Sequence, residues 1–412
     1  MPGNGHEQTA NFRSHLVKTE REGHDARHLP EIDPAGQTRR IRGLEVLFPV
    51  VPTPHDPLAS LRTPDDPPFD VFLSGTVFLD IIFTGLEHPP ALGTEIWTGG
   101  MGSSPGGIAN LAVASSRLGL RTALAAAFGS DLYGDFCWTT LEAQEGVDLS
   151  ASRRFPGWHS PVTVSLAYDR DRAMITHGHP APVPVDEMMG EAPGARASIV
   201  HLTPEPERWV ARARERGSLL FADVGWDPTE TWPAAVLDAL STCYAFLPNS
   251  VEAMHYTRTG TPLQALHRLA ELVPVAVVTC GADGAVAVDR TTGEEAEVPT
   301  LAVEALDATG AGDVFGAAFV LGTLSRWPLA DRLAFANLCA ALSVQQFGGS
   351  LSAPGWGDIA DWWNTVRGSC AAGQPGGCAL MERYAFLDGL VPSVPPCAVR
   401  RATATIGLNA DV

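Results

Sequence analysis

Residues 306–324 read LDATGAGDVFGAAFVLGTL, and this stretch carries the strongest structural signal in the chain. An apolar run ends at Leu306, a turn of small residues follows at 309–312, and Asp313 begins an apolar helical segment. Consecutive small residues let successive backbone N–H groups point at one spot, and the start of a helix adds partial positive charge there. The stretch therefore predicts an anion-binding site made of backbone amides.

Asp313 distinguishes this turn from an ordinary phosphate loop. A carboxylate beside an anion is unfavourable unless it accepts a proton there, and phosphoryl transfer needs both a base for the attacking hydroxyl and amides facing the transferred group. Two other interpretations stay open from the residues alone. Asp313 could cap a helix after a glycine turn. Alternatively, Gly310, Gly312 and Gly316 could form a dinucleotide-binding turn, although they lie late in the chain.

Outward from this stretch, short apolar runs alternate with amphipathic segments. The predicted strands are residues 70–74, 122–128, 198–202, 219–223, 244–248, 275–279 and 285–288, and the predicted helices are 109–118, 135–145, 205–216 and 262–272. Strands that are apolar on both faces and alternate with helices indicate a mainly parallel sheet covered on two sides. The sequence predicts an α/β fold with three layers.

Two segments depart from this alternation of strands and helices. Residues 87–107 are rich in Gly and Pro, and residues 160–176 resemble a hairpin in which VTVSLAY and RAMIT flank a turn at 169–171. Strands that leave an α/β sheet often form a separate small sheet, so these segments predict a β lid over the carboxyl edge. Closing lids exclude water from a reaction.

Composition separates the two ends from the centre. Residues 1–65 are rich in Arg, His, Pro, Gly and acids and predict a mostly disordered extension, and residues 371–412 form a second extension rich in Gly and Pro. Residues 66–370 form the predicted folded body, which includes the lid.

The charge balance excludes several functions. With 47 acidic and 28 basic residues the net charge is -19, which disfavours nucleic acid as a partner.

No apolar run approaches about 18 residues and the amino terminus is polar, so we expect neither a membrane span nor a signal peptide. We therefore expect a cytoplasmic location. The only lysine is Lys18, which excludes a P-loop. Any phosphate must be held by amides, Arg or metal.

The seven cysteines show no C-x-x-C spacing. This pattern predicts reduced thiols that act mainly as small apolar side chains, with neither a zinc site nor a disulfide. They are Cys137, Cys243, Cys280, Cys339, Cys370, Cys378 and Cys397.

Two further motifs each have a structural and a functional interpretation. Asn249 and Glu252, in LPNSVEAMHY, match a helix capping box, which is the favoured interpretation when the motif is taken alone. In SSPGGIANLAVASSRLGL, Gly106 and Gly107 permit close approach of backbone to a ligand. Asn110 begins the following helix, where a cap is the commoner role and a polyol contact the rarer one.

Asp80 lies in LSGTVFLDIIFTG, between apolar residues on both sides. A carboxylate in such surroundings costs several kcal/mol when it is buried without a partner. Asp80 therefore predicts a contact with a ligand or a turn amide.

In this order, the segments resemble the ribokinase-like, PfkB-type carbohydrate kinase family over about residues 69–367. The DATGAGD element at 307–313 looks like its carboxy-terminal signature, and the Gly-rich stretch at 105–119 is similar to its amino-terminal signature. Residues 249–252 resemble its N-x-x-E motif and residues 279–281 its nucleotide-loop T-x-G. The resemblance implies a ribokinase-like three-layer fold with a small β lid.

The resemblance also implies roles for individual residues. Asp313 would be the base that deprotonates the acceptor hydroxyl, within an anion hole at 310–313 (Gly310, Ala311, Gly312 and Asp313) whose amides come from Ala311, Gly312 and Asp313. The implied contacts to Mg²⁺, its waters and the ATP phosphates come from Asn249 and Glu252, and those to the nucleotide from Thr279, Gly281 and Asn337. The implied substrate contacts are Asp80, Gly106, Gly107 and Asn110, and Asp307 and Thr309 would support a monovalent cation such as K⁺.

These features predict an ATP- and Mg²⁺-dependent kinase that phosphorylates a hydroxyl, primary by expectation, of a sugar, sugar derivative or nucleoside. Members of the family often dimerise through their lid strands, so a homodimer is expected. The alternative is a catalytically weak sugar or nucleoside sensor on the same fold. A base beside a phosphate site argues against the sensor, because a binder gains nothing from it.

Overall fold

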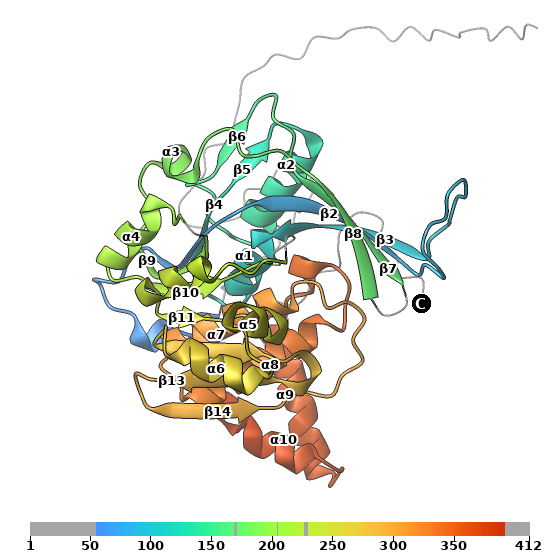
Figure 1. The fold of residues 1–412 in the computed structure, drawn as a ribbon. Coiled ribbons are helices and arrows are strands. Elements are labelled where there is room, and N and C mark those ends of the chain that lie inside the picture. The colour runs from blue at the N-terminus through green and yellow to red at the C-terminus, as the bar shows by residue number, and fades with distance from the viewer. Residues whose placement is uncertain (1–54, 169–170, 204, 226–229, 392–412) are drawn as a thin grey trace, which may run out of the picture. The chain divides into compact units, whose positions relative to one another are not determined.

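The computed structural model describes residues 55–168, 171–203, 205–225 and 230–391, all of which belong to one compact unit that begins at Pro52 (Figure 1). Its strands are β1 (Phe69–Ser74), β2 (Val77–Thr84), β3 (Gly100–Gly107), β4 (Thr122–Ala125), β5 (Ala127–Gly129), β6 (Arg153–Phe155), β7 (Val162–Tyr168), β8 (Asp171–His177), β9 (Ala195–His201), β10 (Leu219–Asp223), β11 (Ala245–Phe246), β12 (Val275–Thr279), β13 (Ala285–Asp289) and β14 (Glu294–Val298). Its α-helices are α1 (Ile108–Arg117), α2 (Leu132–Thr139), α3 (Val185–Met189), α4 (Arg208–Glu215), α5 (Ser250–Thr257), α6 (Pro262–Ala270), α7 (Ala311–Leu324), α8 (Leu329–Ser343), α9 (Trp356–Ala371) and α10 (Gly377–Arg383).

The central sheet has eight strands in the order β14-β13-β12-β11-β10-β9-β1-β4. The six strands from β12 to β4 run parallel, and β13 and β14 are antiparallel at one edge. The predicted α/β class with a mainly parallel sheet is confirmed. The edge strand β14 was not predicted, because its sequence EEAEV alternates exposed acids with smaller residues and has no apolar run.

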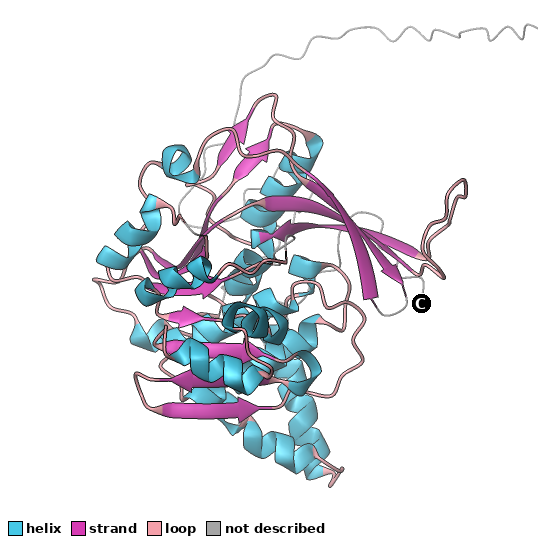
Figure 2. Ribbon diagram, in the orientation of Figure 1, coloured by secondary structure: helices cyan, strands magenta, loops and turns pink. Residues whose placement is uncertain are grey.

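Side chains of the parallel strands alternate between two apolar layers. Val71 and Leu73 of β1 join the layer that contains α1, α7, α8 and α9, whereas Phe72 between them joins the layer of α4, α5 and α6. This period of two is the geometry of a strand buried on both faces. Helices therefore cover both sides of the sheet (Figure 2).

A second sheet, in the order β3-β2-β7-β8, forms the lid and extends to one side of the body (Figure 1). The predicted lid segments 87–107 and 160–176 contribute β3 and the hairpin of β7 and β8, but residues 87–99 form no strand. The central lid strand is instead β2, which pairs with β3 and β7. The sequence reasoning missed β2 because its apolar run gives no sign of which sheet it joins.

The folded body is longer at both flanks than the predicted limits of 66 and 370. Leu58 is fully buried in the main core, and Arg62 forms hydrogen bonds with Asp70 of β1. Beyond α9, Tyr384 and Leu387 are also fully buried. The rest of the two predicted extensions, residues 1–54 and 392–412, lies outside the described residues, as do Lys18, Trp226 and most of the turn at 169–171.

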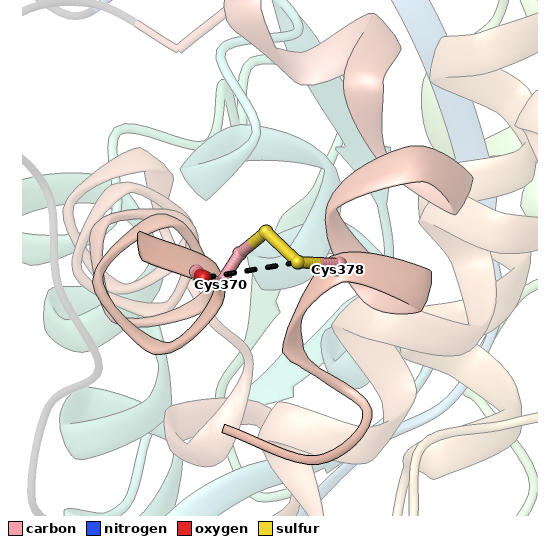
Figure 3. The surroundings of a disulfide bond; sticks show 2 residues. All are labelled: Cys370 and Cys378. Atoms are coloured by element: carbon pink, nitrogen blue, oxygen red, sulfur yellow. Dashed lines mark hydrogen bonds between the residues drawn. A yellow bond between two sulfur atoms is a disulfide. The ribbon is translucent and has the colours of Figure 1, made fainter. Parts of the chain in front are cut away.

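Cys370 and Cys378 form a disulfide between the end of α9 and the start of α10 (Figure 3). The prediction that all cysteines are reduced thiols was therefore wrong for this pair. Cys137, Cys243, Cys280 and Cys339 are free, and Cys280 alone among them is not fully buried. No helix in the described ranges combines the length and the apolar character needed to cross a bilayer.

Candidate active site

The small-residue turn lies directly before α7, which begins at Ala311, two residues earlier than the sequence indicates. Gly310 is the N-cap of α7 and has φ 75°, a left-handed conformation that disfavours residues with a Cβ atom. Asp307 fixes the turn, because its Oδ1 accepts hydrogen bonds from the backbone N–H of Thr309 at 2.9 Å and from its hydroxyl at 2.5 Å. The turn is thus held from within, ahead of the helix.

The backbone N–H groups at the start of α7 differ in whether they have a hydrogen-bond acceptor. The N–H of Ala311 donates to the carbonyl of Ala308 at 3.3 Å, and that of Val314 donates to Gly310 at 2.9 Å. The N–H groups of Gly312 and Asp313 have no acceptor among the described residues, as is usual for the first turn of a helix. These two amides, rather than three, are available for an anion.

Asp313 is oriented by Asn110 of α1. The Asn110 side-chain Nδ2 donates to Asp313 Oδ2 at 2.9 Å, although the two residues lie far apart in the sequence. Burial raises the pKa of Asp313 to about 6, and the hydrogen bond from Asn110 opposes that rise. Asn110 is not the helix cap that was the commoner alternative, because α1 begins at Ile108 after Gly107. Its Oδ1 is buried without a hydrogen-bond partner in the described part of the chain.

Three further carboxyl groups near Asp313 have raised pKa values. Burial, with smaller contributions from the charges of Asp313 and Glu252, raises the pKa of Asp223 to about 8. Burial, followed by the charge of Asp307, raises that of Asp80 to about 7. Burial also raises the pKa of Glu252, against the hydrogen bonds that it makes with Asn249. Such a cluster of acids is typical of a site that binds a cation or transfers a proton.

Asn249 and Glu252 do form a capping box at the start of α5. Asn249 Oδ1 accepts from the N–H of Glu252, and Glu252 Oε2 accepts from the N–H of Asn249, both at 3.0 Å. Asn249 also forms a parallel bridge to Thr279 at the end of β12. The structural interpretation is confirmed, but it does not exclude the functional one, because all three residues line the same cavity.

This cavity of about 340 Å³ lies at the carboxyl ends of β9 to β12, where ligands bind in open α/β sheets. Its polar side is formed by Asp223, Asn249, Glu252, Thr279, Gly310, Gly312 and Asp313 together with Arg172 from the lid, and its apolar side includes Leu111, Ile199, Phe221 and Val320. The cavity brings together the turn before α7, the capping-box pair and the end of β12.

The predicted substrate residues lie at the junction of the lid and α1. Asp80 is in the middle of β2, and a Cβ atom at Gly106 would lie 1.9 Å from Asp80 Oδ2, so only glycine fits beside this carboxylate. Gly107 has φ 64° and ends β3 directly before α1. Asp80 does not line the cavity itself, but the charges of Arg172 and Asp313 influence its pKa.

Two predicted nucleotide contacts do not line the cavity. Asn337 is buried in α8, and its Nδ2 donates to the carbonyl of Val298 at 2.8 Å, which ties α8 to β14. Gly281 begins the short turn after β12. The sequence reasoning in turn missed Arg172. Side chains alternate along β8, so Arg172, Met174 and Thr176 lie on one face of the hairpin. The sequence does not tell which face of the hairpin meets the body.

No group of three His, Cys, Asp or Glu side chains within the described ranges forms a ready-made metal site. Mg²⁺ does not need one, since it keeps several water ligands and is held by one or two carboxylates plus substrate phosphates. Burial raises the pKa values of Glu252 and Asp223. A hydrated cation beside them would stabilise their ionised forms, so the two side chains suit such a cation. The residues present therefore fit Mg²⁺ bound together with a phosphate.

The model of the pfkB family carbohydrate kinases matches residues 75–356, which contain the lid, the turn before α7 and the whole cavity. The chain belongs to this family of carbohydrate kinases. The chain is 28% identical over 267 residues to the nucleoside kinase of Methanothermobacter thermautotrophicus, a match that covers 61% of this chain and 82% of that protein. It is 27% identical over 296 residues to the aminoimidazole riboside kinase of Salmonella typhimurium, with 66% and 90% covered.

The solved structure of Arabidopsis thaliana ribokinase, complexed with ribose and ATP, has a similar fold with a TM-score of 0.56. It is 21% identical, and the match covers 70% of this chain and 96% of the ribokinase. The ribokinase-like fold expected from the resemblance is confirmed.

Proposed function

We propose that this pfkB kinase transfers the γ-phosphoryl group of ATP to a hydroxyl, primary by preference, of a sugar, sugar derivative or nucleoside. The observation that supports this most directly is the position of Asp313, held by Asn110 beside two unpaired amides at the start of α7. A base and an anion-binding pair at one point meet the two requirements of phosphoryl transfer. As an ATP-dependent reaction, it would take place in the cytoplasm.

In the proposed step, the Asp313 carboxylate accepts the proton of the acceptor hydroxyl. The acceptor oxygen forms a bond to the γ-phosphorus while the bond from that phosphorus to the β,γ-bridging oxygen breaks, and ADP leaves with the electron pair. The amides of Gly312 and Asp313 donate to the phosphoryl oxygens as their charge is redistributed. The raised pKa of Asp313, about 6, makes this carboxylate a better base than an exposed one while leaving it ionised at neutral pH.

The nucleotide side of the site is assigned to the residues around α5 and β12. Asn249 and Glu252 would hold the water shell of Mg²⁺ and the ATP phosphates, with Thr279 and Gly281 nearer the nucleotide. Asn337 would act only from behind, because it is buried in α8 with its Nδ2 on the carbonyl of Val298. When bound, Mg²⁺ supplies positive charge that neutralises the phosphates. Asp307 and Thr309 would support a monovalent cation such as K⁺ behind the turn.

The acceptor side is assigned to Asp80, Gly106, Gly107 and Asn110. A carboxylate and an amide can accept and donate hydrogen bonds to neighbouring hydroxyl groups, which is what a polyol offers. The unpartnered Oδ1 of Asn110 supports this assignment, because a buried acceptor without a partner is costly and an acceptor hydroxyl would satisfy it.

We also propose that the lid mediates a homodimer. On β2 and β7, Ile81, Phe83 and Val164 alternate with the inward-facing Asp80, and Ile175 opposite Val164 is 66% exposed. Ile175→Glu places a charge in this face. Light scattering of the wild-type protein should give the dimer mass, and the variant should shift towards the monomer. A monomeric wild type would exclude this dimer.

The kinase activity is tested by measuring ADP formation with Mg·ATP over a panel of sugars, sugar derivatives and nucleosides. At least one acceptor should give turnover above the rate with water alone. The sensor hypothesis predicts the opposite combination: acceptors raise the melting temperature of the protein, but none produces ADP.

A further inference from the structure

Arg172 lies on β8 of the lid and reaches the cavity in the body. In the register of the lid, Thr176 pairs with Thr163, and Thr163 pairs with Asp80, so these three side chains share one face of the sheet. Arg172, four residues before Thr176 on the same strand, projects from that same face. It lines the cavity together with Gly312 and Asp313.

Acidic side chains outnumber basic ones in the cavity lining and its immediate surroundings. Asp223, Glu252 and Asp313 line it, and Asp80 and Asp307 are close enough for Asp307 to raise the pKa of Asp80. Among the described lining residues Arg172 is the only basic one. ATP carries several negative charges, and Arg172 is the one basic side chain among the described lining residues that could pair with them.

Asp307 holds the guanidinium close to the anion-binding turn. Arg172 Nη1 lies 3.7 Å from Asp307 Oδ1, the oxygen that also fixes Thr309. At this distance the contact is an ion pair rather than a close hydrogen bond. It joins the lid to the segment that supplies the amides of Gly312 and Asp313, so the cation is next to the point where the phosphoryl group would bind.

We propose that Arg172 is a catalytic residue that donates hydrogen bonds to the oxygens of the transferred phosphoryl group, with Asp307 guiding its guanidinium towards the turn. This inference rests on the kinase function proposed above. In this role Arg172 is a hydrogen-bond donor and not a proton carrier. The proton of the acceptor still passes to Asp313, and the bonds to phosphorus form and break as described.

Arg172 could instead bind the acceptor substrate, but its contacts favour the phosphoryl group. The acceptor side proposed above consists of Asp80 and Asn110, and the charge of Arg172 lowers the pKa of Asp80, but the ion pair of Arg172 is with Asp307 before α7. Planar bidentate donors match phosphoryl oxygens well. In enzymes that use an arginine in this way, its removal costs about 10³ to 10⁵ in kcat.

The test compares Arg172→Gln and Arg172→Lys with Arg208→Gln, which removes a charge from an 85% exposed side chain on α4. We expect Arg172→Gln to lower kcat at least about 100-fold, with the KM for the acceptor changed less than about threefold. Arg172→Lys should lie between it and the wild type, and Arg208→Gln should match the wild type. In a fourth variant, Arg172→Ala, added guanidinium ion should restore part of the lost kcat. A raised acceptor KM with unchanged kcat would overturn the proposal.

A second variant separates catalysis from a purely structural lid contact. Asp307→Asn removes the ion pair but keeps an oxygen that can accept from Thr309. If Arg172 only fastened the lid, Asp307→Asn, Arg172→Gln and the double variant would have equal kcat values, which would refute the proposal. We expect Asp307→Asn to lose much less activity than Arg172→Gln.

A binding measurement decides the point independently of turnover. By titration calorimetry with Mg²⁺, the wild type should bind a non-hydrolysable ATP analogue more tightly than ADP, and Arg172→Gln should lose most of that difference. An undiminished difference would contradict the role of Arg172. If the wild type turned over no acceptor, the proposed kinase function would fail, while this measurement would still report on Arg172.

Discussion

The pH dependence of the reaction follows from the surroundings of Asp313. Burial raises its pKa from the usual 3.8 to about 6. A general base acts only as the carboxylate, so kcat/KM should be maximal well above pH 6 and fall about tenfold per pH unit below it. About 90% of the base is ionised at pH 7, half at pH 6 and roughly 10% at pH 5. An exposed aspartate would still be almost fully ionised at pH 5.

The assay is kcat/KM for the acceptor between pH 4.5 and 8.5, with ADP quantified directly by chromatography so that no coupling enzyme limits the range. Circular dichroism at each pH confirms that the protein remains folded. Asn110→Ala removes the hydrogen bond that lowers the pKa of Asp313, so the acid limb should move to higher pH. Asp80→Asn tests the other titrating carboxylate near Asp313, because the charges of the two side chains interact.

A folded enzyme whose activity stays constant down to pH 4.5 would refute this reasoning, because the base would then have an ordinary pKa. A limb that moves to lower pH in Asn110→Ala would contradict the assigned hydrogen bond. If the loss of activity at low pH disappeared in Asp80→Asn, the titrating group would be Asp80, whose pKa is about 7, and not Asp313.

Three further predictions concern stability. Arg117→Ala leaves Glu145 charged and buried without its partner, so urea unfolding should show a loss of about 3–5 kcal/mol, and a loss below about 1 kcal/mol would contradict the burial of this pair. Gly310→Ala forces a Cβ atom into a left-handed turn and should cost about 1–2 kcal/mol in the same experiment and lower kcat, whereas unchanged values would show that the turn can relax. Reduction of the Cys370–Cys378 disulfide, which spans eight residues of sequence, should lower the free energy of unfolding by about 2 kcal/mol, and Cys378→Ser should make stability independent of reductant.

The sheet was predictable because each buried strand carries its own signal. Val71, Phe72 and Leu73 are apolar on successive sides, which suits a strand between two helical layers and little else. The turn before α7 was predictable for a similar reason, since its small residues and following helix are local features. β14 has no apolar run that would predict a strand. Its acidic residues Glu294, Glu295 and Glu297 give this edge strand the composition of a polar loop.

The contacts between distant segments could not be predicted from local pattern. Asn110 meets Asp313 only because α1 and α7 pack on the same face of the sheet. Arg172 reaches Asp307 only through the pairing of β2 with β7, which brings the hairpin over the body. The cysteine spacing likewise did not reveal that α10 folds back on the end of α9 and pairs Cys370 with Cys378.

Asp313→Asn tests the central claim most directly, with kcat and the free energy of unfolding measured on the same preparation. Removing the base should lower kcat by about two to four orders of magnitude. Because the folded pKa is raised by about two units, ionised Asp313 destabilises the native state above pH 6 and not below about pH 4. The variant should therefore be more stable at pH 7.5, by up to about 3 kcal/mol, and unchanged in stability at pH 3.5. A variant that turns over at the wild-type rate would contradict the role of Asp313 as the base.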